Sequence, residues 1–251
     1  MKQTNKCPTK QPQNRRRHQH RRNKGAAAAL LLLLICGSLT QAGAQKDRDW
    51  QTIFSVDKKT LGVIGSNPYF NLTPGYQLSF RHGKETDVIT VLNEVKRIDG
   101  VDTRVVEDRE YDGNGKLVEL TRDYYAIDSS TNDVYYFGED VDVYDKDGKV
   151  KCHEGSWISG VNGATFGLMM PARPKAGQKF YQEQAPGLAM DRVEIASVSA
   201  KLNVPAGKFM NVVHVIETTP LEIGNADKWY VTGVGMVKDE DMELVQFGMK
   251  K

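Results

Sequence analysis

Cysteine and histidine are scarce in this chain, and their scarcity excludes whole classes of chemistry. The 251 residues include three cysteines and five histidines. Only Cys152 lies beyond the first 44 residues, so a chain cut there is expected to form no internal disulfide. His82, His153 and His214 do not combine with cysteine or acidic residues in a zinc-binding spacing. We therefore expect no metal and no cofactor, and a fold held together by its apolar core.

Catalytic motifs are also lacking. No G-x-S-x-G serine motif occurs, and no G-x-x-x-x-G-K-[ST] or G-x-G-x-x-G element opens a helix. Cys152 and His153 are neighbours on a predicted strand, where they point to opposite faces and cannot act as nucleophile and base. We assign no catalytic residue and favour a non-enzymatic protein. A hydrolase with two carboxylates distant in the sequence remains a third hypothesis.

The aspartate-rich segment 139–148 resembles part of a calcium-binding loop. With Gly148 at the sixth position of an EF-hand loop, Asp145 and Asp147 take positions that supply ligands, but Val143 takes the first. The flanking residues favour strands rather than helices. The segment is therefore interpreted as a hairpin with an Asp-Gly turn, and a weak surface calcium site is the alternative.

The N-terminal 44 residues hold no acidic side chain and no apolar run long enough to span a membrane. Nine Lys and Arg side chains precede an apolar run at 26–36, which is far short of the roughly 20 residues a spanning helix needs. Ala42-Gly43-Ala44 then supplies a small-x-small site. This pattern is typical of a signal peptide cleaved after Ala44. An uncleaved anchor is the alternative, and it would be the chain's only membrane segment. Lipidation of Cys36 is disfavoured, since Ile35 precedes it. We expect an exported protein, periplasmic or secreted.

Removing residues 1–44 reverses the sign of the net charge. This segment contains nine of the 34 basic side chains and none of the 32 acidic ones, which leaves 25 against 32 and a formal net charge of −7. Binding to a phosphate backbone depends on Lys and Arg contacts. We therefore expect no nucleic-acid partner.

The remaining chain divides into a short lead-in and one domain. In residues 45–66, the spacing of Trp50, Ile53, Phe54 and Leu61 is compatible with a short N-terminal helix. Residues 67–251 form the single β domain. The predicted strands are 76–82, 86–98, 102–111, 117–127, 133–138, 140–145, 149–155, 178–184, 189–202, 208–219, 227–237 and 242–248.

The turns between these runs predict an all-β fold of antiparallel strands. Asp112-Gly113-Asn114-Gly115 and Asp147-Gly148 supply residues that accept the positive φ of tight hairpins. The run 209–216 is apolar on both faces and predicts a central strand. So many strands with short connections favour an antiparallel meander that forms a strongly curved sheet or barrel. A two-sheet sandwich is the alternative.

One long segment, 157–177, lacks a strand pattern yet is rich in apolar residues. We expect it to fold back over an opening of the sheet, either as a lid or as a plug that completes the core. Its apolar residues and nearby aromatic residues are the candidate ligand-binding set. That set is Tyr125, Tyr136, Trp157, Phe166, Met169 and Tyr181.

Several segments together resemble a family of uncharacterised bacterial exported proteins, often lipoproteins, with an antiparallel, half-barrel-like domain. They are NPYFNLTPG (67–75), YYFGEDV (135–141), EGSW (154–157), MPARPKAG (170–177), YQEQAPG (181–187), ETTPLE (217–222) and GVGMVK (233–238). The resemblance implies an extracytoplasmic bacterial protein, and it brings no catalytic residue to carry over.

Two functions follow as the main hypotheses. The first is a binding domain that takes a small apolar or amphipathic ligand on the concave face of the curved sheet. The second is a structural or interaction module of the cell envelope, which docks on a partner protein through sheet edges or residues 45–66.

Overall fold

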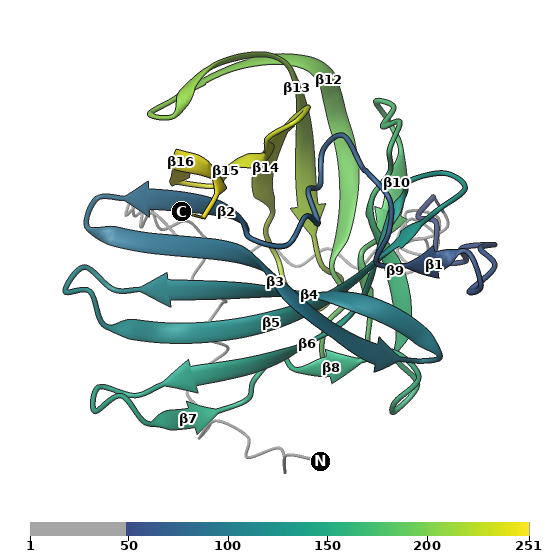
Figure 1. The fold of residues 1–251 in the computed structure, drawn as a ribbon, viewed down its shortest axis with the longest axis horizontal. Helices are drawn as coiled ribbons and strands as arrows, with labels where there is room; N and C mark the ends of the chain where they lie inside the picture. Colours follow the sequence, from purple (N-terminus) through teal and green to yellow (C-terminus); the bar gives the residue numbers. More distant parts are fainter. Residues whose placement is uncertain (1–48, 251) are drawn as a thin grey trace, which may run out of the picture.

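The structure is a computed structural model that describes residues 49–250, and all regular structure in this range is β-strand (Figure 1). The strands are β1 Leu61–Gly62, β2 Tyr76–His82, β3 Glu85–Ile98, β4 Val101–Tyr111, β5 Leu117–Asp128, β6 Val134–Tyr144, β7 Val150–Cys152, β8 Trp157–Ile158, β9 Thr165–Met170, β10 Lys179–Tyr181, β11 Glu183–Gln184, β12 Arg192–Val204, β13 Gly207–Thr218, β14 Ala226–Val231, β15 Gly235–Asp239 and β16 Met242–Met249. The predicted signal peptide and its cleavage after Ala44 lie outside the described residues. Within 49–250, no helix has the length and apolar character needed to cross a membrane.

The strands form one antiparallel path that nearly closes on itself. Its order is β10-β12-β13-β14-β15-β16-β2-β3-β4-β5-β6-β9-β11. The two end strands, β10 and β11, are separated only by Gln182 in the sequence. The chain therefore changes partner at that residue, from β12 on one side to β9 on the other. This confirms the predicted antiparallel, strongly curved, barrel-like sheet.

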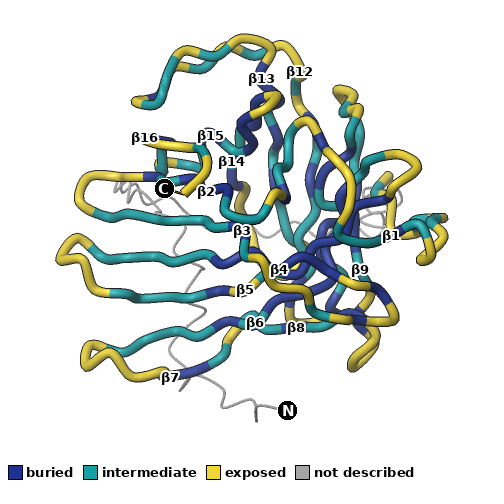
Figure 2. Tube along the Cα trace, viewed as in Figure 1, coloured by how far each residue is buried: buried dark blue, intermediate teal, exposed yellow. Residues whose placement is uncertain are grey.

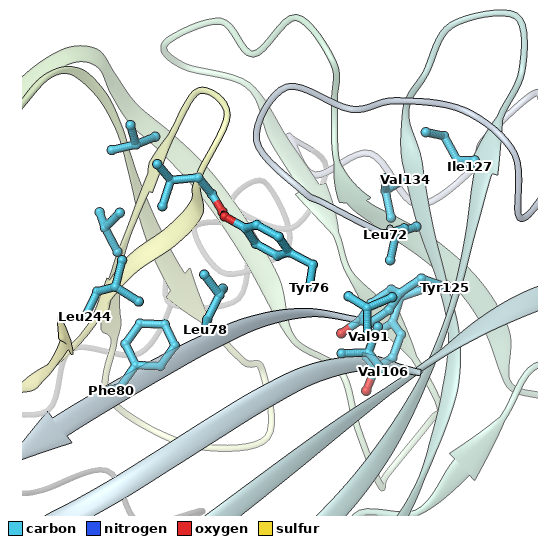
Figure 3. Packing of buried hydrophobic residues seen from close by; sticks show 14 of the residues in the cluster. Leu72, Tyr76, Leu78, Phe80, Val91, Val106, Tyr125, Ile127, Val134 and Leu244 are labelled. Atoms are coloured by element: carbon cyan, nitrogen blue, oxygen red, sulfur yellow. The ribbon is translucent and has the colours of Figure 1, made fainter. Parts of the chain in front are cut away.

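Alternating side chains on the strands pack into two apolar clusters, one on each face of the sheet. Tyr125 and Tyr136 belong to one cluster, whereas their neighbours Tyr124 and Tyr135 belong to the other. Figure 3 shows the first cluster, in which Tyr125 lies with Val91 and Val106. The wall that carries these tyrosines is therefore buried on both faces.

The hairpin turns form as the sequence predicted, with aspartate side chains closing them. The Asp112 carboxylate accepts the backbone N–H of Lys116, at 3.0 Å, and Asp145 accepts that of Lys149 at the same distance. These backbone hydrogen bonds hold the pKa of both carboxyl groups below the usual value. Gly148 supplies the left-handed conformation, with φ 75°. Both aspartates thus serve as turn-forming acceptors.

The segment 157–177 differs from the prediction, because it contains two strands. β9 pairs with β6 on one side and with β11 on the other. In β9, Leu168 and Met170 are buried on one face. The segment is therefore part of the wall and not an irregular lid or plug.

Two strand boundaries also differ from the prediction. Residues 133–138 and 140–145 form one continuous strand, β6, in which Gly138 has φ 130°. A Cβ at Gly138 would lie 2.3 Å from the Trp157 carbonyl oxygen, so the absent side chain lets β8 approach. Conversely, 227–237 is split into β14 and β15 by a turn at Gly233, whose φ is 79°.

The prediction of a short helix in the lead-in is wrong for the described residues 49–66, which contain no helix. The Gln51 N–H donates to the Lys179 carbonyl oxygen, and its own carbonyl accepts the Tyr181 N–H, both at 3.0 Å. Phe54 packs edge-on against Tyr135, with 6.0 Å between ring centroids. Pairing with the end strand β10 satisfies the backbone groups that a helix would otherwise satisfy internally.

The run 209–216 is a buried central strand only in its second half. Val212, Val213 and Val215 are buried, whereas Met210 is 59% exposed. The first half of β13 pairs with β12 alone, and the two extend past the rest of the sheet as an arm (Figure 1).

Cys152 is 1% exposed and is disulfide-bonded. The expectation that a chain cut after Ala44 forms no internal disulfide concerns the cleaved form and stays a prediction.

Candidate ligand cavity

The concave face of the curved sheet encloses a cavity of about 290 Å³. One wall consists of inward-facing residues of β3, β4, β5 and β6, and the other of residues of β13, β14 and β15. The exposed hairpin tips of β2–β3 and β4–β5 lie at one end, and the strands converge toward buried residues away from them (Figure 2). The cavity is therefore set by the curvature of the sheet rather than by a mobile loop.

Part of the lining is apolar and aromatic. Tyr125 and Tyr136 stack with 4.8 Å between centroids and an interplanar angle of 22°. Phe70 packs edge-on against Tyr125, also at 4.8 Å. Along β3, the inward side chains change from Glu85 and Asp87 beside the hairpin to Ile89 and Val91. The lining thus combines a ligand-sized apolar surface with charged groups nearer the hairpin.

The rest of the lining is strongly acidic. Among the described residues 49–250, thirteen that line the cavity carry a carboxyl group, and Lys228 is the only one with a basic side chain. The acids are Glu85, Asp87, Asp108, Glu110, Glu119, Asp123, Glu139, Glu183, Asp191, Glu217, Asp239, Glu240 and Asp241. Carboxylates gathered in a concave surface focus a negative potential into it.

Asp87 and Asp108 have the most perturbed environment in this lining. Asp87 is opposite Glu110 and Asp108 is opposite Ile89, so the two aspartates are diagonal neighbours on β3 and β4. Each has one buried oxygen, Oδ1, without a hydrogen-bond partner. Burial raises the pKa of Asp87 to about 7 and that of Asp108 well above its usual value. The contact between the two carboxyl groups lowers the pKa of Asp87 and raises that of Asp108, and burial is the largest cause of both raised pKa values.

Lys228 shows how a cation is stabilised on the opposite wall. Its Nζ lies 3.0 Å from Glu217 and 3.6 Å from Asp239. Burial alone lowers the pKa of an ammonium group, but the Asp239 and Glu217 carboxylates raise the Lys228 pKa well above its usual value. The ammonium therefore stays charged although it is buried.

The outer face of the same strands has a different charge pattern. There Glu107 pairs with Arg109 at 2.7 Å and with Arg122 at 3.4 Å. Lys96 pairs with Asp140 at 2.9 Å. On the outer face, arginine and lysine side chains are thus paired with acids.

The six predicted ligand-binding residues separate into two groups. Tyr125, Tyr136 and Met169 line the cavity. Trp157 lies behind Tyr136, in edge-on contact at 5.4 Å, and is only 4% exposed. Their role in binding stays a prediction.

The other two predicted residues lie away from the cavity. Phe166 stacks on Phe137 at 4.8 Å and belongs to the opposite apolar cluster. The Tyr181 hydroxyl accepts a hydrogen bond from Arg192 at 3.1 Å, and its ring lies edge-on to Trp50. Tyr181 therefore helps to attach the lead-in to the sheet.

Sequence reasoning missed the acidic lining. A usable signal was present: Asp108 and Glu110 are separated by one residue on the predicted strand 102–111, so the two share a face. What the sequence could not show is that these faces turn inward.

Two of the three described histidines, His153 and His214, lie against acidic side chains. The His214 Nε2 lies 2.6 Å from Asp227, and its ring stacks on Trp229 at 4.9 Å. The His153 Nδ1 lies 2.8 Å from Asp142. Among residues 49–250, no group of three or more histidine, cysteine or acidic side chains has the arrangement of a metal site.

Comparison with known proteins gives similarity to two solved structures. No model of a known protein family matches the chain, and no curated protein matches it. One structure is a candidate exported protein with a YmcC-like fold from Bacteroides fragilis, at 13% identity and a TM-score of 0.40; the alignment covers 73% of this chain and 100% of that one. The other is a candidate lipoprotein from Parabacteroides distasonis, at 10% identity and a TM-score of 0.36, covering 74% and 100%. Both descriptions are of the kind of protein that the sequence resembles.

Proposed function

We propose that this protein is a non-enzymatic binding domain of the bacterial cell envelope or its exterior, which holds a small amphipathic molecule on the concave face of its sheet. The observation that carries the proposal is the cavity of about 290 Å³, lined by Tyr125, Tyr136, Val91 and Val106 together with charged groups. A concave, largely apolar lining with a few polar groups is typical of small-molecule sites.

The fold supports this proposal because most of the cavity lining lies on strands rather than on loops. The cavity lies between walls that belong to one continuous sheet. A preformed site avoids the cost of ordering loops when the ligand binds.

Titration with a neutral, environment-sensitive apolar dye tests the proposal. We expect saturable binding at one site, with a rise in fluorescence as the dye leaves water. Ile89→Trp places a large ring into the cavity, since Ile89 lines it. We expect this variant to weaken dye binding at least tenfold.

Val88→Trp is the matched control. Val88 is the chain neighbour of Ile89 on β3 and points to the other face. Both substitutions place tryptophan, a good strand former, on one strand. Equal binding by the two variants, or no saturable binding by the native protein, would contradict the proposal.

A further inference from the structure

Most charged groups of the cavity lining already have partners within the protein. Lys228 is held by Glu217 and Asp239. Ten of the lining acids, these two among them, have interactions inside the chain, so none of the ten is free for a ligand's charge. A charged ligand would therefore compete with interactions that the protein makes by itself. The ten are Glu85, Glu110, Glu119, Asp123, Glu139, Glu183, Asp191, Glu217, Asp239 and Glu240.

Two oxygen atoms in the lining differ from these groups. The Oδ1 atoms of Asp87 and Asp108 are buried, and neither has a hydrogen-bond partner among the described residues 49–250. Native proteins leave few buried polar atoms without a partner. A ligand that donates hydrogen bonds at this place would supply both missing partners.

The two aspartates lie beside the apolar part of the lining. On β3 and β4, Asp108 is directly opposite Ile89, and the next inward row pairs Val91 with Val106. Asp87 precedes Ile89 by two residues, so it shares the inward face. Successive rows on one face are about 7 Å apart. A molecule with a polar end and an apolar chain thus matches the order of side chains along these strands.

This place also disfavours charge on the carboxyl groups. Burial raises the pKa of Asp87 to about 7 and that of Asp108 well above its usual value. A neutral carboxyl group offers one O–H donor together with acceptor oxygens, and it carries no charge that would attract a cation. A hydroxyl group likewise donates and accepts, so hydroxyl groups match this pair in both forms of hydrogen bonding.

We infer that the ligand is an uncharged amphiphile whose polar end carries several hydroxyl groups, as a sugar or glycerol unit does, and hydrogen-bonds to Asp87 and Asp108. This inference rests on the proposed function and names its ligand class. The apolar chain would lie on the surface formed by Ile89, Val91 and Val106.

Displacement of the neutral dye by three probes of equal chain length tests the inference. The probes are octyl glucoside, its tetra-O-methyl ether, which has no hydroxyl group, and octylammonium. At pH 6 and below the concentrations at which micelles form, we expect octyl glucoside to displace the dye at a concentration at least ten times lower than either other probe. Apolar contact alone would instead favour the methyl ether.

Two double variants with the same change in net charge assign this preference to the aspartates. Asp87→Val/Asp108→Val removes the oxygen atoms and keeps good strand-forming residues, and it should reduce the preference to less than threefold. Asp87→Asn/Asp108→Asn is the matched control. It keeps a neutral donor and acceptor at each position, so its preference should stay above threefold.

Folding of the variants is checked by circular dichroism. The single variants Asp87→Val and Asp108→Val are measured as well, and each should lower the preference at least twofold. They keep the test decisive if the double valine variant does not fold.

The possible outcomes separate the two claims. If the dye binds but octyl glucoside shows less than a tenfold preference, the inference is overturned and the proposed function stands. The same holds if the valine variants keep the native preference, or if the asparagine variant loses it. If neither the dye nor any octyl probe binds, the proposed function is overturned and the inference falls with it.

Discussion

At the scale of single residues, Asp87 lies in an environment that disfavours its charged form. Burial is the largest cause of the raised Asp87 pKa. A hydrogen bond with Asp108 lowers the Asp87 pKa, whereas the nearby charges of Glu110, Asp239 and Asp123 raise it further. The folded protein therefore binds a proton at Asp87 more tightly than the unfolded chain does. Such a group makes stability fall as pH rises from about 4 to about 7.

The variant Asp87→Asn tests this linkage. Because asparagine is neutral at every pH, we expect the variant to be more stable than the native protein at pH 8, on the order of 3 kcal/mol, and the difference to fade toward pH 4. Urea unfolding at several pH values measures it. Asp102→Asn, at an exposed surface ion pair, should change stability by less than about 1 kcal/mol throughout. A pH-independent difference for Asp87→Asn would contradict the account.

Residue roles were predictable where the local pattern alone decides them. Asp112 and Asp145 form turns as expected, because their hydrogen bonds reach only two to four residues along the chain. Phe166 and Tyr125 look alike in the sequence, yet one lies outside the cavity and the other lines it. That difference depends on the curvature of the whole sheet, which no local pattern contains.

At the scale of elements, closure of the sheet depends on a close approach between β9 and the chain just before β11. A Cβ added at Gly167 would lie 2.4 Å from the carbonyl oxygen of Gln182 and 2.5 Å from that of Tyr181. Both contacts are to backbone atoms, which cannot rotate away. The absent side chain therefore lets β9 meet the segment that joins the two ends of the sheet.

Gly167→Ala should accordingly destabilise the protein by about 2 kcal/mol, the usual cost of overpacking a tight site. The measurement is the midpoint of urea unfolding. Gly62→Ala is the control, since a Cβ there meets no atom within 4 Å, and it should leave the midpoint nearly unchanged. Equal effects of the two substitutions would show that β9 does not approach the closing segment so tightly.

The elements that were mispredicted from the sequence, β9 and the lead-in, both depend on pairing with distant strands. β9 contains Gly167 and two adjacent methionines, which have low strand propensity and obscure the strand pattern. Hydrogen bonding to the neighbouring strands β6 and β11 stabilises β9 instead. The apolar residues of the lead-in have helical spacing, but the bridge between Gln51 and Phe180 holds this segment in an extended conformation. Strands with clear alternation, such as β2 at Tyr76–His82, occur where the sequence placed them.

At the scale of the whole molecule, the charge of the exported form depends on cleavage. If cleavage follows Ala44, the protein begins at Gln45 and carries a formal net charge of −7. N-terminal sequencing of the exported protein should give Gln45 as the first residue. A first residue of Met1, or any start upstream of the apolar run 26–36, would show that the segment is retained as an anchor.

The central claim, a small amphipathic molecule bound on the concave face of the sheet, is tested most directly by mapping the binding site with backbone amide chemical shifts. On titration with the neutral apolar dye, we predict the largest changes at inward-facing positions, among them Ile89, Val91 and Tyr125. Little change should occur at Met210 on the protruding arm of β12 and β13. Changes confined to that arm or to the outer face, or no saturable change at all, would contradict the account.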